Sequence, residues 1–221
     1  MITGNFILLD AARMNEAMEE AQRLNPAHES LYPKEDNVLL QSVAPYLFRF
    51  ENESEFNHYF IEKGWGDNWG VMINSKASFD ELHKHFRRFL MVKTEDGVQL
   101  FFRFYDPRVL RIFLPTCDFK QLQEFFGPVQ SFLLEDEDFR YGIRFWLQNG
   151  SLQSKKIHFR EISSSGINPT NADNETEPVE SANIQQDTTT LFIPKQHHNE
   201  TNSQTNNGTL KPNKPKWNML D

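Results

Sequence analysis

The run from Gly97 to Cys117, GVQLFFRFYDPRVLRIFLPTC, constrains the fold of this chain more than any other segment. Asp96-Gly97, at its start, is typical of a tight hairpin turn, because glycine adopts the positive φ angles that such a turn needs. From Val98 to Tyr105 the side chains alternate as they do in a strand with one apolar face. The segment therefore predicts an antiparallel hairpin over residues 91–105.

A helix is expected to begin directly after this hairpin. Asp106 can accept hydrogen bonds from the free N–H groups of a first helical turn, and Pro107 suits the first helical position. Pro115 is expected to end the helix, because proline has no N–H group to donate. The pattern predicts a helix over 107–114.

The first half of the chain alternates between strand and helix patterns. Strands are expected over 6–9, 46–50 and 71–74, and helices over 10–24, 53–63 and 78–90. Asp10 is expected to cap the first helix, and Ser78 with Glu81 forms a capping box for the third. An order of strand, helix and strand predicts parallel pairing with right-handed crossovers. We therefore expect an α/β domain with a mixed sheet, whose first half is Rossmann-like without a glycine-rich loop.

The second half predicts a small part made of helices and strands, followed by a polar tail. A further helix is expected over 119–126, and antiparallel strands over 129–134, 141–148 and 155–162. From Ser163 the chain is rich in Asn and Thr, and such a composition buries too little apolar surface to offset the entropy of ordering. The expected parts are a domain over 1–135, closing strands over 136–162 and a disordered tail over 163–221.

Two apolar islands interrupt this tail, at 190–194 and 217–220. Isolated apolar clusters of this kind often act as short docking segments that order on binding. The alternative is a tail that only keeps the protein in solution. The sequence favours neither interpretation.

Composition narrows the class of protein. The net charge of −8 argues against a nucleic-acid partner, because binding phosphates requires a basic face. A single cysteine, Cys117, excludes an internal disulfide and fits a reducing compartment. The first twenty residues lack the basic start of a signal peptide, and no apolar run reaches the ~20 residues of a membrane span. We expect a soluble intracellular protein that does not enter a membrane. Its 20 phenylalanines are expected to fill a core or to form apolar interfaces with partners.

Two motifs that resemble binding sites are better explained by structure. His83 and His85 lie two residues apart on a helix and therefore point away from each other, so they are not expected to share a metal ion. The glycines of GWGDNWG at 64–70 have roughly the spacing of a phosphate loop, but they lie between a helix and a strand, the reverse of a dinucleotide fingerprint. Trp65 and Trp69 are expected to pack over neighbouring elements or to contact a partner. No cofactor is expected.

Arg103, Asp106 and Arg108 form the one group of residues that could pass for an active site. In a catalytic interpretation Asp106 is a base, the two arginines bind an anion and His85 moves a proton. In a structural interpretation Asp106 caps the helix and pairs with an arginine. A third interpretation places the arginines in a partner interface. The acidic block at 135–138 is expected to be a solvated loop.

The chain resembles the adaptor proteins, or effector chaperones, of bacterial type VI secretion. The resemblance rests on seven short pieces in the family's order, and none of them is specific alone. They are LLDAA at 8–12, SLY at 30–32, APYL at 44–47, WGDNWG at 65–70, ELHKHFRRFL at 81–90, FRFYDPRVL at 102–110 and FFGPV at 125–129.

The resemblance implies a non-catalytic cytoplasmic protein that binds a toxic effector and loads it onto the spike, a valine-glycine-repeat protein. Besides the residues around Asp106, including Tyr105 and Pro107, it marks His85 and Arg87, which match an HxR pattern of the family. Two other classes of function remain open. One is a small enzyme that uses the Arg/Asp/His cluster, and the other is a phage-like assembly protein.

Overall fold

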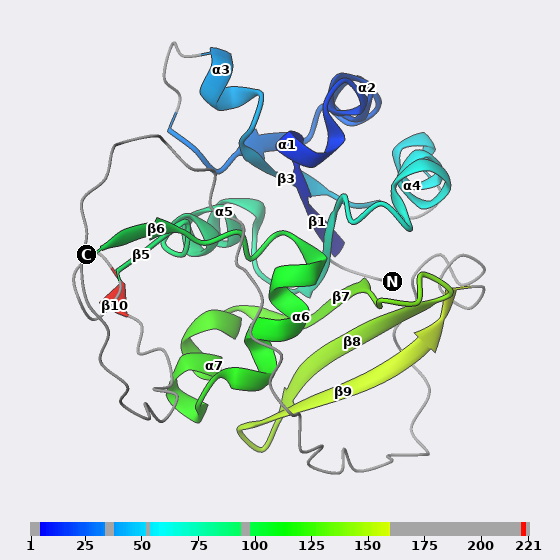
Figure 1. The fold of residues 1–221 in the computed structure, drawn as a ribbon. Helices are drawn as coiled ribbons and strands as arrows, with labels where there is room; N and C mark the ends of the chain where they lie inside the picture. The colour runs from blue at the N-terminus through cyan, green and yellow to red at the C-terminus, as the bar shows by residue number, and fades with distance from the viewer. Residues whose placement is uncertain (1–4, 34–37, 52–53, 94–97, 160–217, 220–221) are drawn as a thin grey trace, which may run out of the picture. The chain divides into compact units, whose positions relative to one another are not determined.

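A computed structural model describes residues 5–33, 38–51, 54–93, 98–159 and 218–219. Its centre is a seven-stranded sheet in the order β2-β3-β1-β4-β7-β8-β9, with helices on both faces (Figure 1). The expected α/β class is confirmed. The strands are β1 (Asn5–Asp10), β2 (His28–Ser30), β3 (Pro45–Arg49), β4 (Gly70–Ser75), β7 (Val129–Glu135), β8 (Tyr141–Gln148) and β9 (Ser151–His158).

The expected parallel pairing is wrong, because every neighbouring pair of strands in this sheet is antiparallel. The three-residue strand β2 is the physical reason, since it lies inside a segment that we expected to be a loop. β1 and β2 run in the same direction, and so do β3 and β4, but a strand of opposite direction separates each pair. The helices between β1 and β2, and those between β3 and β4, therefore connect parallel strands, but those strands are not neighbours.

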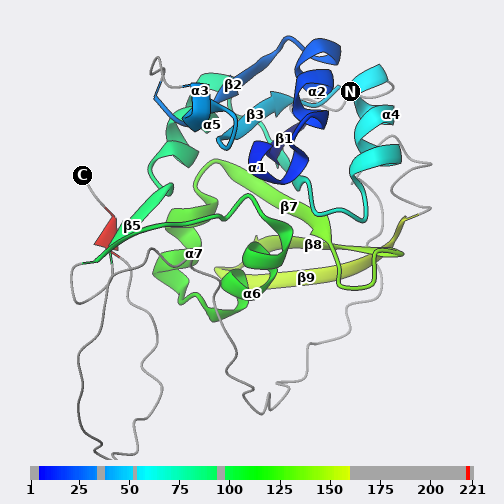
Figure 2. The same cartoon turned by 45° about the horizontal axis from the view of Figure 1, so that its top comes forward.

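Both faces of β1 are buried, and this divides the core into two clusters. Phe6 and Leu8 point into one cluster, while Ile7 and Leu9 point into the other. Helices α5, α6 and α7 cover the first cluster, and α1, α2, α4 and η1 cover the second (Figures 1 and 2). The helices are α1 (Ala11–Met14), α2 (Ala17–Leu24), α3 (Val38–Gln41), α4 (Glu55–Tyr59), the π-helix η1 (Phe60–Gly64), α5 (Phe79–Arg87), α6 (Pro107–Thr116) and α7 (Phe119–Phe126).

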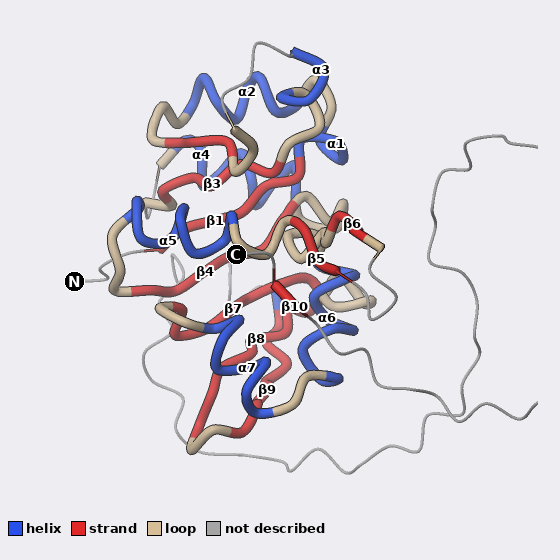
Figure 3. Tube along the Cα trace, turned by 90° about the vertical axis from the view of Figure 1, so that its left-hand side faces the viewer, coloured by secondary structure: helices blue, strands red, loops and turns tan. Residues whose placement is uncertain are grey.

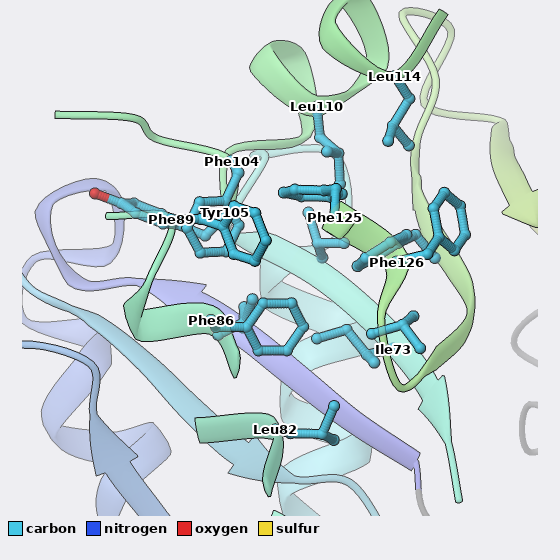
Figure 4. Packing of buried hydrophobic residues seen from close by; sticks show 14 of the residues in the cluster. Ile73, Leu82, Phe86, Phe89, Phe104, Tyr105, Leu110, Leu114, Phe125 and Phe126 are labelled. Carbon is cyan, nitrogen blue, oxygen red and sulfur yellow. The ribbon is translucent and has the colours of Figure 1, made fainter. Parts of the chain in front are cut away.

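The first cluster is dominated by aromatic rings (Figure 4). Phe86 of α5 stacks on Phe104 with 5.7 Å between ring centroids, and Phe125 of α7 meets Phe104 edge-to-face at 5.8 Å. Phe132 on β7 joins both Phe86 and Phe125. Much of the chain's phenylalanine therefore fills a core, and this core holds the start of α6 against the sheet.

The hairpin forms a small second sheet in the order β10-β5-β6, visible beside α5 and α6 in Figure 3. β5 (Met91–Lys93) pairs antiparallel with β6 (Gln99–Phe101), as expected, whereas the Asp96-Gly97 turn lies outside the described residues. The strand pattern was expected to continue to Tyr105, but β6 ends at Phe101 and residues 104–105 form a turn. The chain turns early because Phe102, Phe104 and Tyr105 are all drawn into the core.

Two helix boundaries also differ from the expectation. The helix expected over 10–24 is interrupted at Asn15, whose φ of +51° is a left-handed conformation that asparagine tolerates. α6 continues through Pro115 to Thr116. The missing N–H of Pro115 removes one backbone hydrogen bond, and the helix ends one residue beyond it rather than at residue 114.

Most of the expected tail lies outside the described residues, and so do the boundary at 163 and the island at 190–194. The exception is β10 (Asn218–Met219), which pairs antiparallel with β5. We expected no regular structure at these two residues. They belong to the second apolar island, and the edge of β5 offers its backbone groups a partner.

Candidate functional site

The start of α6 is organised by Asp106. Its side chain accepts a hydrogen bond from the Arg108 N–H at 3.0 Å, which makes it the N-cap, and Pro107 occupies the first helical position, as expected. The Arg108 guanidinium donates to both carboxylate oxygens, with Nε–Oδ1 at 3.0 Å and Nη2–Oδ2 at 2.6 Å. Asp106 is buried, and this set of contacts fully occupies it.

Arg103 connects this helix start to the distant strand β1. Its Nη2 donates to Oδ2 of Asp10 and lies 3.9 Å from Oδ2 of Asp106. Asp10 was expected to cap the helix that follows it, but its side chain makes no capping hydrogen bond. The expectation is wrong because the carboxylate pairs instead with the guanidinium of Arg103, a charged donor.

Burial shapes the electrostatics of this cluster. Asp10 is 1 % exposed, and burial raises its pKa while the hydrogen bond and charge of Arg103 lower it. Its second oxygen, Oδ1, has no hydrogen-bond partner among the described residues. Burial likewise raises the pKa of Tyr105, whose side chain hydrogen-bonds Tyr32. The two aspartates and two arginines balance in charge, so the cluster holds together without an ion.

Apolar side chains beside the cluster are exposed. Phe101 is 66 % exposed and lies against Tyr32, with 6.2 Å between ring centroids. The side chains of Arg103 and Arg108 are 44 % and 47 % exposed. We call Phe101, Arg103, Arg108 and Tyr32 the hairpin surface. It combines the exposed ring of Phe101 with two guanidinium groups, each of which pairs with a buried carboxylate.

His85 and Arg87 lie elsewhere. His85 is buried on α5, and burial lowers its pKa to about 4, so its ring is neutral at pH 7. Its Nε2 therefore donates to the Phe125 carbonyl at 2.8 Å, while Nδ1 accepts from Arg88 Nη2 at 3.0 Å. Arg87 is exposed at the end of the same helix. His85 thus bonds to Phe125 and Arg88 and not to the Arg103–Asp106 group, with which the catalytic interpretation combined it.

The glycine-tryptophan loop at 64–70 binds the side-chain carboxylate of another residue in the same chain. The carboxylate of Glu135, at the end of β7, accepts hydrogen bonds from the N–H groups of Gly66 at 2.8 Å and Asn68 at 3.1 Å. Glu135 is 1 % exposed, and burial raises its pKa to about 7 against the lowering effect of these bonds. The acidic block at 135–138 was expected to be a solvated loop. This is wrong for Glu135, which is buried because it accepts the hydrogen bonds of the loop at 64–70.

The two tryptophans anchor this loop differently. Trp69 is buried in the second core cluster. Trp65 is half-buried, stacks on Phe159 and donates from Nε1 to the Phe139 carbonyl at 2.7 Å. Packing over neighbouring elements, one of the two expected roles, therefore describes both.

Three further features concern the described part of the chain: clusters of metal ligands, the cysteine thiol and the length of the helices. No three His, Cys, Asp or Glu side chains gather there closely enough to hold a metal ion. His83 and His85 bond to carbonyls of different elements, at Ser30 and Phe125. Burial raises the pKa of Cys117 to about 12, so its thiol is protonated at neutral pH. None of the helices in these ranges combines the length and the apolar character needed to cross a bilayer.

Sequence reasoning did not single out Asp10 and Glu135 as site residues. Asp10 lies 93 positions from Arg103 in the chain, and Glu135 lies 69 positions from Gly66. A usable signal existed at both positions, because each is an acid at the end of a strongly apolar strand. Such an acid is buried with its strand and must find a partner.

Three of the motif segments, far apart in sequence, meet at the hairpin surface or directly beneath it. Asp10 belongs to LLDAA, Tyr32 to SLY, and Arg103 with Arg108 to FRFYDPRVL. The molecule is an α/β domain with a polar cluster under an exposed aromatic residue. A family model described as a domain of unknown function, DUF4123, matches residues 5–124. The chain belongs to this family, which is associated with type VI secretion effectors.

No curated protein matches the chain, and no solved structure matches it.

Proposed function

We propose that this protein is a non-catalytic adaptor that binds a type VI secretion effector in the cytoplasm and brings it to the spike protein. The convergence of three motif segments on the hairpin surface carries the proposal, together with membership of the DUF4123 family. The surface offers an exposed ring and two positioned guanidinium groups. Aromatic residues and arginine are the types that anchor protein interfaces most often.

The contacts within the cluster favour a binding role over a catalytic one. Both oxygens of Asp106 accept hydrogen bonds from Arg108, so the carboxylate is poorly placed to take a proton from a substrate. His85 is committed to Phe125 and Arg88 on another side of α5. A general base must reach the proton that it removes, and neither residue of the catalytic interpretation meets this requirement.

The arginines are held so that they can contact a partner at low entropic cost. Their carboxylate partners are buried, while the outer faces of both guanidinium groups remain about half exposed. A rigid arginine loses little rotamer freedom on binding. The partner surface that fits is apolar with carbonyl or carboxylate groups at its rim. The chain's own charge of −8 disfavours nucleic acid as this partner.

Copurification tests the proposal. Tagged protein is expressed with the effector and the spike protein encoded beside it, and we expect both to copurify. Phe101→Ser should weaken effector binding at least about tenfold, as loss of an interface anchor does. Phe139→Ser is the matched control, since Phe139 is 63 % exposed but lies in the turn between β7 and β8. If neither partner copurifies with folded wild-type protein, the adaptor function is wrong.

A further inference from the structure

The small sheet contains an unusual pairing between segments that are distant in the chain. β10, at residues 218–219, lies along β5 at residues 91–93, with Asn218 opposite Lys93 and Met219 opposite Val92 (Figure 3). The other edge of β5 is taken by β6. Within the described ranges, β10 is the strand that pairs with this side of β5.

This pairing is short and therefore easily reversed. β10 has two residues and β5 has three, and strand pairs of this size are marginal in water without packing on other elements. Sheet edges of this kind accept any extended segment that supplies the complementary backbone groups. A second strand that offers better packing would compete for the same edge.

An apolar cavity lies beside this edge. It has a volume of about 40 Å³ and is lined by Val92 of β5 together with Phe89, Phe102, Phe113 and Phe125. Val92 is the residue opposite Met219. Gln121 and Glu124 of α7 complete the lining and give it one acidic group. A cavity of this size exceeds the volume of one water and has a mostly apolar lining, so it suits a methyl group or a larger apolar group.

The sequence around β10 fits this environment. Asn218 and Met219 stand between Trp217 and Leu220, and the preceding stretch, 211–216, carries three lysines and two prolines. A ligand for this edge should combine apolar side chains, which suit the cavity, with basic residues, which suit the carboxylate of Glu124. The segment thus has the composition of a peptide ligand.

We propose that the β5 edge with its neighbouring cavity is a binding site for an extended segment of a partner protein that carries large apolar side chains beside basic residues, and that β10, residues 218–219, is its exchangeable resident. The resident strand keeps the edge covered until a partner strand replaces it. Because the resident is tethered, an external strand competes against an effective concentration on the order of millimolar or below. This proposal does not rest on the adaptor function.

The test uses the full chain and a synthetic amidated peptide of residues 211–221 as the probe. The double variant Asn218→Pro/Met219→Pro lacks both backbone N–H groups of the resident strand. The strand can therefore no longer donate a backbone hydrogen bond to β5. The peptide should bind this variant at least about tenfold more tightly than wild type, as expected if the resident fills the site nine-tenths of the time. A peptide with the same two prolines is the matched control and should bind neither protein.

Amide hydrogen exchange locates the site. Exchange at residues 91–93 should be faster in the double variant and should slow again when the peptide is added, while β1 and β4 stay unchanged as a control for folding. Equal affinity for both proteins, or no binding to either, would overturn the proposal. A wild-type dimer that becomes monomeric in the double variant would also overturn it, since the strand would then be exchanged between copies.

Discussion

At the scale of single residues, buried carboxylates decide how this protein is held together. Asp10, Asp106 and Glu135 are each at most 2 % exposed, and each pairs with an arginine or with backbone N–H groups. Burying a charge is costly unless it is paired and hydrogen-bonded. These acids therefore specify which segments must meet, and they are more sensitive to substitution than the exposed acids nearby.

Asp106→Ala should lower the free energy of unfolding by roughly 1–2 kcal/mol, because the N-cap of α6 is lost. Arg108 adds little to this loss, since its side chain is about half exposed and can be solvated. Urea denaturation measures the change. Asp106→Asn is the control, because asparagine caps helices about as well as aspartate and should retain most of the stability. An alanine variant as stable as wild type would show that the cap contributes nothing.

The dependence of stability on pH should reveal Glu135. Its pKa is about 7 in the folded protein and 4.5 in the unfolded chain, so folding takes up a proton between these values. Its contribution to the unfolding free energy is therefore fully present below pH 4.5 and is lost as the pH rises through 7. Glu135→Gln should remove this contribution. We expect wild-type stability relative to the variant to fall by up to about 1.4 kcal/mol per pH unit between these limits.

His85 opposes this effect in the wild type. Its pKa falls from 6.5 to about 4 on folding, so folding releases a proton and the unfolding free energy rises with pH over that range. Comparing wild type with Glu135→Gln in urea at several pH values cancels the part that comes from His85. The charges of Asp67 and Arg111, which act on Glu135, are present in both proteins. Parallel stability curves would show that Glu135 does not titrate in this window.

At the scale of elements, the ends of helices carry the most specific local chemistry. α5 and α7 begin with complete capping boxes, at Ser78 with Glu81 and at Asp118 with Gln121. α7 ends at Gly127, which has a φ of +46°. A Cβ atom there would lie 2.4 Å from Cε1 of His85. The FFGPV motif therefore needs a glycine at residue 127, because the backbone at the end of α7 passes close to the buried ring of His85.

Gly127→Ala should lower the free energy of unfolding by roughly 2 kcal/mol or more. A left-handed backbone costs about 1–2 kcal/mol for a residue with a Cβ, and the contact with His85 adds strain. Gly66→Ala is the matched control. Gly66 also has a positive φ, +99°, but an added methyl group would meet only Phe139 at 3.9 Å. Thermal denaturation of both variants separates the cost of the backbone from that of the clash, and equal losses would count against the role given to His85.

At the scale of the whole molecule, one sheet unites two cores. β1 and β4 contribute residues to both clusters, with Phe6 and Ile73 in one and Ile7 and Met72 in the other. Loss of packing on one face therefore weakens the strands that support the other. The described domain should unfold as one cooperative unit.

Substitutions in either core test this cooperativity. Phe86→Leu in the first cluster and Phe48→Leu in the second should each cost about 1 kcal/mol, because both rings are fully buried. Far-UV circular dichroism reports the sheet and helices, while tryptophan fluorescence includes the buried Trp69 in the second cluster. We expect the two signals to change together in wild type and in both variants. Separate transitions would mean that the clusters unfold independently.

The sequence by itself determined the parts of this protein that depend on neighbours in the chain. The capping box of α5, the Asp106-Pro107 helix start, the β5–β6 hairpin and most strands were predicted, because a cap acts over three residues and burial follows a period of two or 3.6.

Only the tertiary structure decided how these parts meet. The three-residue β2 was too short to give a periodic signal, and its presence changed the neighbours of every strand in the first half. The pairs Asp10–Arg103 and Glu135–Gly66 join residues that this fold brings together, and Met219 pairs with Val92 in the separate small sheet. Such contacts join residues that are far apart in the chain, so their free energy appears only once the sheet has brought the two ends of each pair together.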